Sequence, residues 1–198
     1  MKRKLFAGAV IAICLSLIAY GTLAYFTAED TARNVITSGG IDIQLREWAD
    51  KEKTTPFPED EVSGVMPGTE VTKIVEVENT GSADAYIRVR VEKDIVLPEG
   101  TEGDPDTGLM ILDFDDTCWT LGEDGFYYYN VALKPGAVTE PLFASVSFDP
   151  GMGNLYQDST ATVDVKVYAV QVANNGKTVM DAQGWPASET GVASGVTG

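Results

Sequence analysis

Carboxylates in one central stretch are the side chains best placed to do chemistry. Acidic residues crowd between residues 102 and 124, and the candidates for a calcium site are Asp104, Asp106, Asp113, Asp115 and Asp116. Oxygen-rich loops of this kind bind Ca²⁺, and extracellular Ca²⁺ is plentiful enough to fill weak sites. Their spacing does not match the EF-hand loop, so solvated loop carboxylates are the preferred interpretation. We therefore expect no cofactor, with Ca²⁺ as the one ligand to test.

Histidine is missing from all 198 residues. It is the usual general base near neutral pH and the commonest zinc ligand. Ser-His-Asp hydrolysis, Cys-His proteolysis and His-ligated zinc catalysis are therefore excluded. The residue types for an Asp-dyad or a Ser-Lys enzyme are present in the chain, but no motif supports either class of enzyme. The sequence predicts that the protein is not an enzyme.

Two further features could bind or react. The run Phe126-Tyr127-Tyr128-Tyr129 could stack on sugars, but successive strand residues face opposite sides, so at least one or two of these Tyr belong to the core. Carbohydrate binding needs an exposed pair. Cys118, flanked by Thr117 and Trp119, is interpreted as a buried small hydrophobe rather than a nucleophile or an intermolecular link.

Charge and length set the class of protein. The chain has 14 Lys and Arg against 30 Asp and Glu, and 44% of it is hydrophobic. So acidic a chain is unsuited to nucleic acid, whose phosphates attract Lys and Arg. Its apolar content and length predict one folded domain.

The N-terminus has the layout of an export signal. Lys2, Arg3 and Lys4 precede an uncharged run from Leu5 to Phe26. We predict a signal peptide over 1–24, cleaved between Ala24 and Tyr25. Cleavage removes three basic residues and no acidic one, which takes the net charge from −16 to −19. The other interpretation is an uncleaved anchor, because the run is long enough to span a bilayer.

The remaining sequence alternates apolar and polar residues with the period of β-strands. The clearest case is 85–92, where odd positions such as Ile87 and Val89 face inward and even positions such as Tyr86 and Arg88 face outward. The predicted strands cover residues 41–45, 71–77, 85–92, 109–114, 117–121, 126–133, 142–148 and 161–169. The fold class is therefore all-β, an antiparallel jelly-roll-like β-sandwich of about eight strands, preceded by a signal peptide.

The sequence also predicts the connections between strands and the C-terminal end of the domain. Residues 49–64 and 98–108 are predicted to be exposed loops, and Asn79 to Ser82 a hairpin-like connection. A last short element is expected over 174–185. The sandwich domain is predicted over 38–185 and a flexible tail over 186–198.

Several stretches resemble one family of exported proteins. Residues 21–45, GTLAYFTAEDTARNVITSGGIDIQL, are similar to the signal-to-mature junction of proteins processed by the dedicated signal peptidase of Gram-positive biofilm matrix systems. Residues 65–91, VMPGTEVTKIVEVENTGSADAYIRVRV, resemble the turn-strand-turn-strand unit of the TasA and camelysin family. Residues 125–170 resemble the C-terminal half of shorter family members.

The resemblance implies a secreted subunit of extracellular fibres, in the biofilm matrix or on the surface of a Gram-positive-type bacterium. Residues 25–37 occupy the place of a donor strand that is added to the next subunit, with apolar anchors at Tyr25, Phe26, Val35 and Ile36. The other interpretation of 25–37 is a flexible lead-in to the protein's own first strand.

The implied partners are copies of the chain in a filament and the signal peptidase during export. Membrane contact is expected only through the uncleaved signal. The alternative function is a monomeric cell-surface adhesion or carbohydrate-binding module. The metallopeptidase activity attributed to camelysin is not expected, because there is no His for an HExxH zinc site.

Overall fold

The computed structural model describes residues 35–37, 41–58, 62–63 and 67–186. The chain divides into two units between Asn34 and Val35, and all described residues belong to the second. The predicted signal peptide and nearly all of the predicted tail lie outside these residues. Among them, no helix has the length and apolar character needed to cross a membrane.

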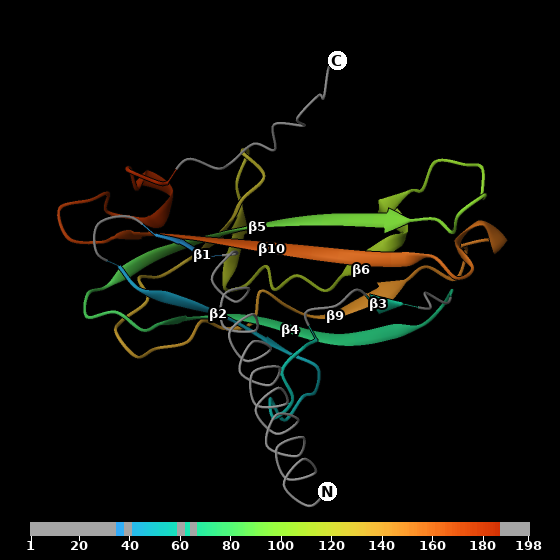
Figure 1. Cartoon of the computed structure of the whole chain (residues 1–198). Helices are drawn as coiled ribbons and strands as arrows, with labels where there is room; N and C mark the ends of the chain where they lie inside the picture. The colour runs from blue at the N-terminus through green and yellow to red at the C-terminus, as the bar shows by residue number, and fades with distance from the viewer. Residues whose placement is uncertain (1–34, 38–40, 59–61, 64–66, 187–198) are drawn as a thin grey trace, which may run out of the picture. The chain divides into compact units, whose positions relative to one another are not determined.

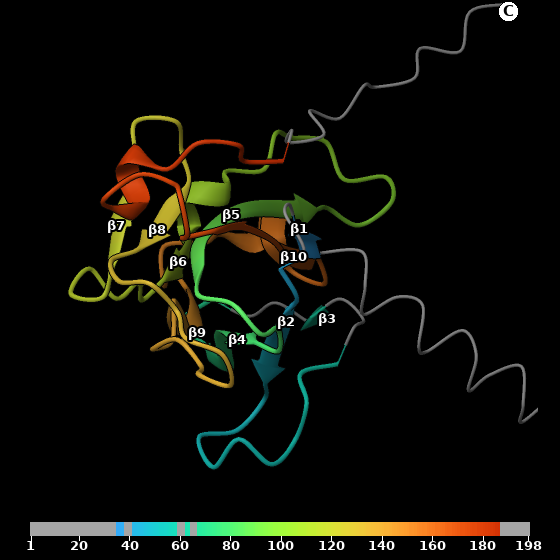
Figure 2. The ribbon, with the colours of Figure 1, turned by 90° about the vertical axis from the view of Figure 1, so that its left-hand side faces the viewer.

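In the described residues, ten strands form two sheets that face each other (Figures 1 and 2). The strands are β1 (Val35–Thr37), β2 (Ile43–Trp48), β3 (Val62–Ser63), β4 (Glu70–Asn79), β5 (Ala85–Val96), β6 (Met110–Leu112), β7 (Trp119–Leu121), β8 (Tyr127–Tyr129), β9 (Phe143–Phe148) and β10 (Thr160–Gln171). Three short 3-10 helices accompany them, η1 (Thr107–Leu109), η2 (Asn154–Tyr156) and η3 (Val179–Asp181). The first sheet has the order β1-β10-β5-β8-β7, with β3 also on β10, and the second has the order β2-β4-β9-β6.

The chain changes sheets at almost every connection from β4 onward. It passes from β4 in the second sheet to β5 in the first, returns for β6, crosses again for β7 and β8, and ends with β9 and β10 in opposite sheets. All pairs are antiparallel except β1 with β10. These alternating crossings confirm the predicted all-β, jelly-roll-like sandwich.

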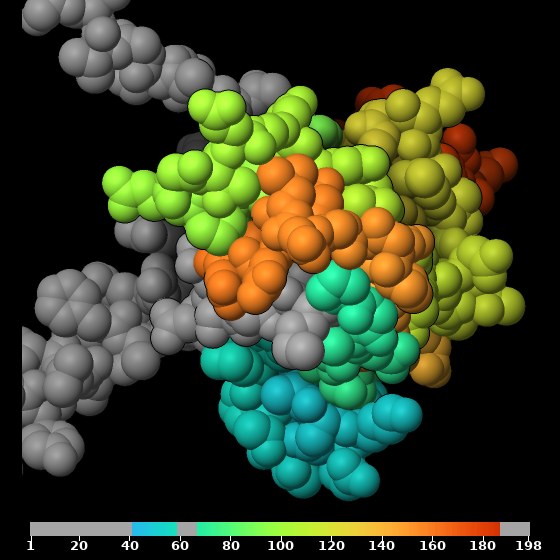
Figure 3. All heavy atoms as spheres, turned by 90° about the vertical axis from the view of Figure 1, so that its right-hand side faces the viewer, coloured from blue at the N-terminus to red at the C-terminus, as the bar shows by residue number. Residues whose placement is uncertain are grey.

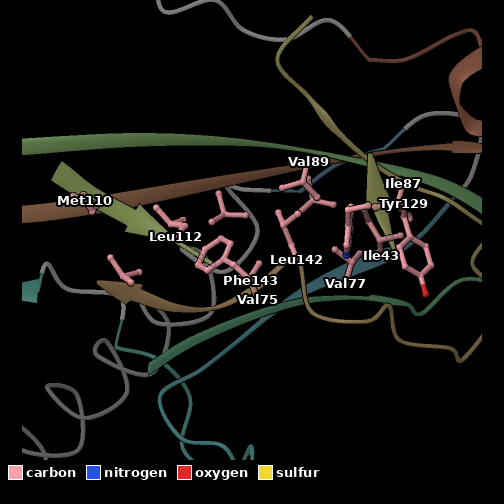
Figure 4. Close-up of a cluster of buried hydrophobic side chains, with 14 of the residues drawn as sticks. Ile43, Val75, Val77, Ile87, Val89, Met110, Leu112, Tyr129, Leu142 and Phe143 are labelled. Carbon is pink, nitrogen blue, oxygen red and sulfur yellow. The ribbon is translucent and has the colours of Figure 1, made fainter. Parts of the chain in front are cut away.

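The core fills the space between the sheets with the predicted inward positions. Ile87 and Val89 of β5 are fully buried and face Val75 and Val77 of β4, as Figure 4 shows. The 12 residues of β10 pair with the whole of β5, so these two long strands form the largest pairing of the first sheet. Apolar alternation therefore identified the face that each long strand buries.

The connection between β4 and β5 is not the predicted hairpin. Its two strands lie in different sheets, so the turn from Asn79 is an arch across the sandwich. The Asn79 side chain is completely buried, and its amide nitrogen donates to the Ala83 and Leu133 carbonyls at 2.8 Å each. These bonds hold the arch closed against the loop after β8.

The predicted loop at 49–64 contains more structure than expected. Residues 49–57 fold back on β2, where Trp48 forms a bridge with Pro56. Phe57 then covers the buried Lys73, whose ammonium lies 4.0 Å from the ring centroid and 2.7 Å from a Glu47 carboxylate oxygen. Strand β3 also falls in this range, so the prediction of a loop was wrong for these two residues.

The predicted loop at 98–108 lies at one end of the sandwich beside the connection from β9 to β10 (Figure 3). The Asp106 amide donates to the Tyr156 hydroxyl at 2.9 Å, and Gly103 lies against Leu155. The tip at 99–104 is exposed, as predicted, while its far end is tied to η2.

Candidate assembly edge

The outer edge of β10 is the feature most directly related to the predicted assembly strand. On its inner side β10 pairs with β5 along its whole length. On the outer side β1 pairs in parallel with Val167–Ala169, and β3 pairs antiparallel with Thr160 and Ala161. The two short strands lie towards opposite ends of β10 (Figure 1). Between them, residues 162–166 pair on this side with no strand of the described part of the chain.

The strand that carries this edge is firmly anchored. Val165 and Val167 are buried in the core, and Tyr168 is buried on the opposite face. The Lys166 ammonium lies 2.9 Å from Glu92 on β5, and this hydrogen bond holds the pKa of Glu92 below its usual value. An edge fixed in this way keeps its main-chain groups in register for an added strand.

The predicted assembly residues are only partly covered by the structure. Val35 and Ile36 lie in β1, in register with Val167 and Tyr168 of the same chain. Ala24, Tyr25 and Phe26 lie outside the described residues. The C-terminal end of the predicted donor strand is therefore a strand of its own subunit, at the edge of β10.

The calcium candidates do not converge, and three of them accept hydrogen bonds from main-chain amides at separate places. Asp106 accepts a hydrogen bond from the Gly108 amide, Asp113 accepts from the Ala144 and Ser145 amides, and Asp115 accepts from Thr117 and Cys118. The bonds from Thr117 lower the pKa of Asp115. Asp104 and Asp116 are exposed. Within the described ranges, no three Cys, Asp or Glu residues gather into a group that could hold a metal.

The tyrosine run is used for packing. Tyr127 stacks on Phe114 with ring centroids 4.2 Å apart, and Tyr129 packs against the buried Trp119. Tyr128 is buried and its hydroxyl donates to Asp124 at 2.7 Å. Burial raises the pKa of all three phenols. The run therefore offers no exposed pair for stacking on a sugar.

Cys118 lies half-buried against the core. Burial is the largest cause that raises the pKa of its thiol, followed by a hydrogen bond with Asp115. Because the thiolate is the reactive form, this environment makes Cys118 a poor nucleophile.

A second apolar cluster, which sequence reasoning missed, covers the outer face of the first sheet. It contains Tyr86, Phe126, Tyr128, Tyr168, Val170 and Val179, with Trp185 against it. The Arg88 guanidinium lies inside it, 4.0 Å from the Phe126 ring centroid and 4.6 Å from that of Trp185. Tyr86 and Arg88 face outward as predicted, but residues 172–185 fold over them. Aromatic residues at outward positions of two paired strands could have indicated in the sequence that this face is covered.

Comparison with known proteins gives one match. A family model described as camelysin metallo-endopeptidase matches residues 1–107, which extend through β5 and the following loop. No curated protein and no solved structure matches the chain. The description implies a metal, yet the residues do not fit one, because the chain has no His and the described part gathers no carboxylate group suited to a metal.

Proposed function

Because the chain belongs to the camelysin family, which includes TasA-like proteins, we propose that it is a secreted structural protein whose copies assemble into extracellular fibres. The family membership supports a secreted matrix protein. The assembly mechanism rests on the edge of β10.

The observation that carries the mechanism is the parallel pairing of β1 with β10. Val35–Thr37 is the end of the predicted donor strand, and it pairs with Val167–Ala169 within one chain. The same pairing made between two chains adds the N-terminal segment of one subunit to the sheet of the next. Tyr25 and Phe26 supply further apolar anchors upstream. Such a contact is head-to-tail and does not close, so it propagates a filament.

Export supplies the switch in this proposal. While residues 1–24 remain attached, the apolar signal segment ties the donor strand to the membrane. Cleavage after Ala24 by a dedicated signal peptidase releases Tyr25 and the strand that follows. Fibres then form outside the cell, in the matrix or at the surface of a Gram-positive-type bacterium.

The test compares two purified chains, one beginning at Tyr25 and one beginning at Ser38, which lacks the proposed donor strand. Electron microscopy is expected to show filaments for the first chain and separate particles for the second. Circular dichroism checks that both are folded. The mechanism is overturned if the longer chain stays monomeric at high concentration, or if the shorter chain polymerises equally well.

We also propose that the protein acts without peptidase activity, against the wording of the family description. The support is the set of possible zinc ligands. Zinc peptidase sites of the HExxH type need two His residues, and this chain has none. Incubation of the chain from Tyr25 with an unfolded protein substrate is expected to leave the substrate intact. Cleavage that a chelator abolishes would contradict this.

A further inference from the structure

The outer edge of the second sheet is a place where strand addition would be harmful. Strand β6, at this edge, consists of three apolar residues, and Ile111 at its centre is 49% exposed. Open apolar edges recruit strands from other chains, and natural proteins block them. A protein that assembles by strand addition has particular need of such a block, because a second open edge would branch or cross-link its filaments.

The register identifies which groups face this open edge. Met110 is opposite Phe148 and Leu112 is opposite Val146, while the Asp149 amide donates to the Leu109 carbonyl. Hydrogen-bonded and non-bonded pairs alternate in an antiparallel ladder, so Met110 and Leu112 point their main-chain groups away from β9. The Met110 amide already donates to the Thr107 carbonyl, so an added strand would have to bind the Met110 carbonyl and the main-chain groups of Leu112.

Lys93 occupies one of these groups from the opposite sheet. It lies on β5 between Val91 and Ile95, at an inward position of the apolar alternation. Its ammonium crosses to the other sheet and donates to the Met110 carbonyl at 2.7 Å. Within the described residues Lys93 forms no ion pair with a carboxylate, and its ammonium bonds this carbonyl instead.

We propose that Lys93 blocks the β6 edge of the second sheet against strand addition. An incoming strand needs the Met110 carbonyl as an acceptor and must displace the ammonium from it. The displaced ammonium, which belongs to a half-buried side chain, would lose this charge-assisted hydrogen bond, and that loss opposes the addition. The consequence for filament shape rests on the proposed function, whereas the block itself concerns association of any two copies through β6.

The test compares Lys93→Met with Lys93→Arg in the chain beginning at Tyr25. The Met side chain keeps the aliphatic stem and loses the charge and the donors, while Arg keeps both. Light scattering measures the protein concentration at which each variant begins to associate. We expect this concentration to be about tenfold lower for Lys93→Met than for the wild type, and unchanged for Lys93→Arg. Unchanged association of a folded Lys93→Met variant overturns the proposal.

Hydrogen exchange locates the new contact. The Leu112 amide faces the open edge, so it is expected to become protected in the Lys93→Met assemblies and to stay unprotected in the wild type. The double variant Lys93→Met with Ile111→Lys restores a charge on β6 and should return association to the wild-type level. Association that leaves Leu112 unprotected, or that the double variant does not reverse, contradicts the block.

The two proposals fail in different ways. If the wild-type chain forms no filaments but Lys93→Met still associates through β6, the fibre mechanism is lost and the block stands. If the wild type forms filaments and Lys93→Met forms the same unbranched ones, the block is lost and the fibre mechanism stands.

Discussion

The Asn79 side chain makes several hydrogen bonds in the arch between the sheets. Its amide nitrogen donates to the Ala83 and Leu133 carbonyls, and its side-chain oxygen accepts from the Gly81 amide at 3.0 Å. Asn79→Ala leaves these buried groups without partners and is expected to lower the free energy of unfolding by about 3 kcal/mol. Urea denaturation measures the loss. Asn154→Ala, at an exposed residue whose side chain makes no hydrogen bond within the described part of the chain, is the control and should change the free energy of unfolding by less than about 0.5 kcal/mol.

Tyr127 allows the effect of alkaline pH to be isolated. Burial raises the pKa of its phenol. The unfolded chain releases this proton near pH 10, so between that pH and the folded pKa the folded state binds more protons, and the free energy of unfolding falls as the pH rises. Tyr127→Phe removes this titration, so the variant should lose less stability above about pH 10. Urea midpoints across the pH series check this, and identical alkaline losses would refute it.

At the residue scale the sequence predicted which side chains face the core, but it did not predict that some outward side chains are covered. Ile87 and Val89 are buried because alternation reports directly on a half-buried strand. Tyr86 and Arg88 face outward but are covered, because a segment about 90 residues further along the chain folds over them. A residue's own strand carries no information about such a distant cover.

The segment at 172–185 is the element that creates the second cluster. Its Trp185 ring lies against Arg88 and, at a centroid distance of 6.0 Å, against Tyr128. Trp185→Ala should therefore destabilise the protein by about 2 kcal/mol, through lost apolar contact and lost cation–π attraction. Thermal unfolding with Met180→Ala as a control tests this, since Met180 is 52% exposed in the same segment. Equal effects of the two substitutions would mean that the segment does not pack as described.

Element prediction succeeded for the long strands and for β6, β7 and β8, which lie within the predicted strands 109–114, 117–121 and 126–133, but it did not identify β1 and β3 as strands of the chain's own sheet. β5 and β10 each have 12 residues, enough for alternation to be read along the strand. β1 and β3 have three and two residues, which is too few to show a period. The arch at Asn79 was mistaken for a hairpin because turn residues mark a change of direction and do not specify whether the next strand joins the same sheet.

At the scale of the whole molecule, edges decide what the sandwich can do. Pro56 covers part of β2, Lys93 binds β6, and β1 and β3 lie on β10. The candidate edge could not be predicted from the sequence, because sheet order decides which strands are outermost. The donor segment stays a prediction, which rests on the resemblance of residues 21–45 to the junction of exported matrix proteins.

The net charge of −19 that the chain would have after the predicted cleavage opposes the contact that the proposed assembly requires. Like-charged subunits repel over a distance set by the Debye length, which falls from about 30 Å at 0.01 M salt to about 8 Å at 0.15 M. Filament growth from the chain beginning at Tyr25 should therefore accelerate about tenfold over this range of NaCl, as followed by light scattering. Growth that slows with salt would show that attraction between charged groups, and not repulsion, controls the encounter.

An experiment with calcium distinguishes screening of the net charge from specific binding of the cation. The carboxylates of Asp106 and Asp115 accept hydrogen bonds in their own turns, Asp113 accepts from amides of β9, and no metal-binding group forms among the described residues. CaCl₂ and NaCl at matched ionic strength should therefore accelerate growth to a similar extent. The chelator EDTA should leave preformed filaments intact. Growth that needs Ca²⁺ beyond its ionic strength, with dissolution by EDTA, would show that the cation bridges acidic surfaces of neighbouring subunits and that screening alone is an insufficient account.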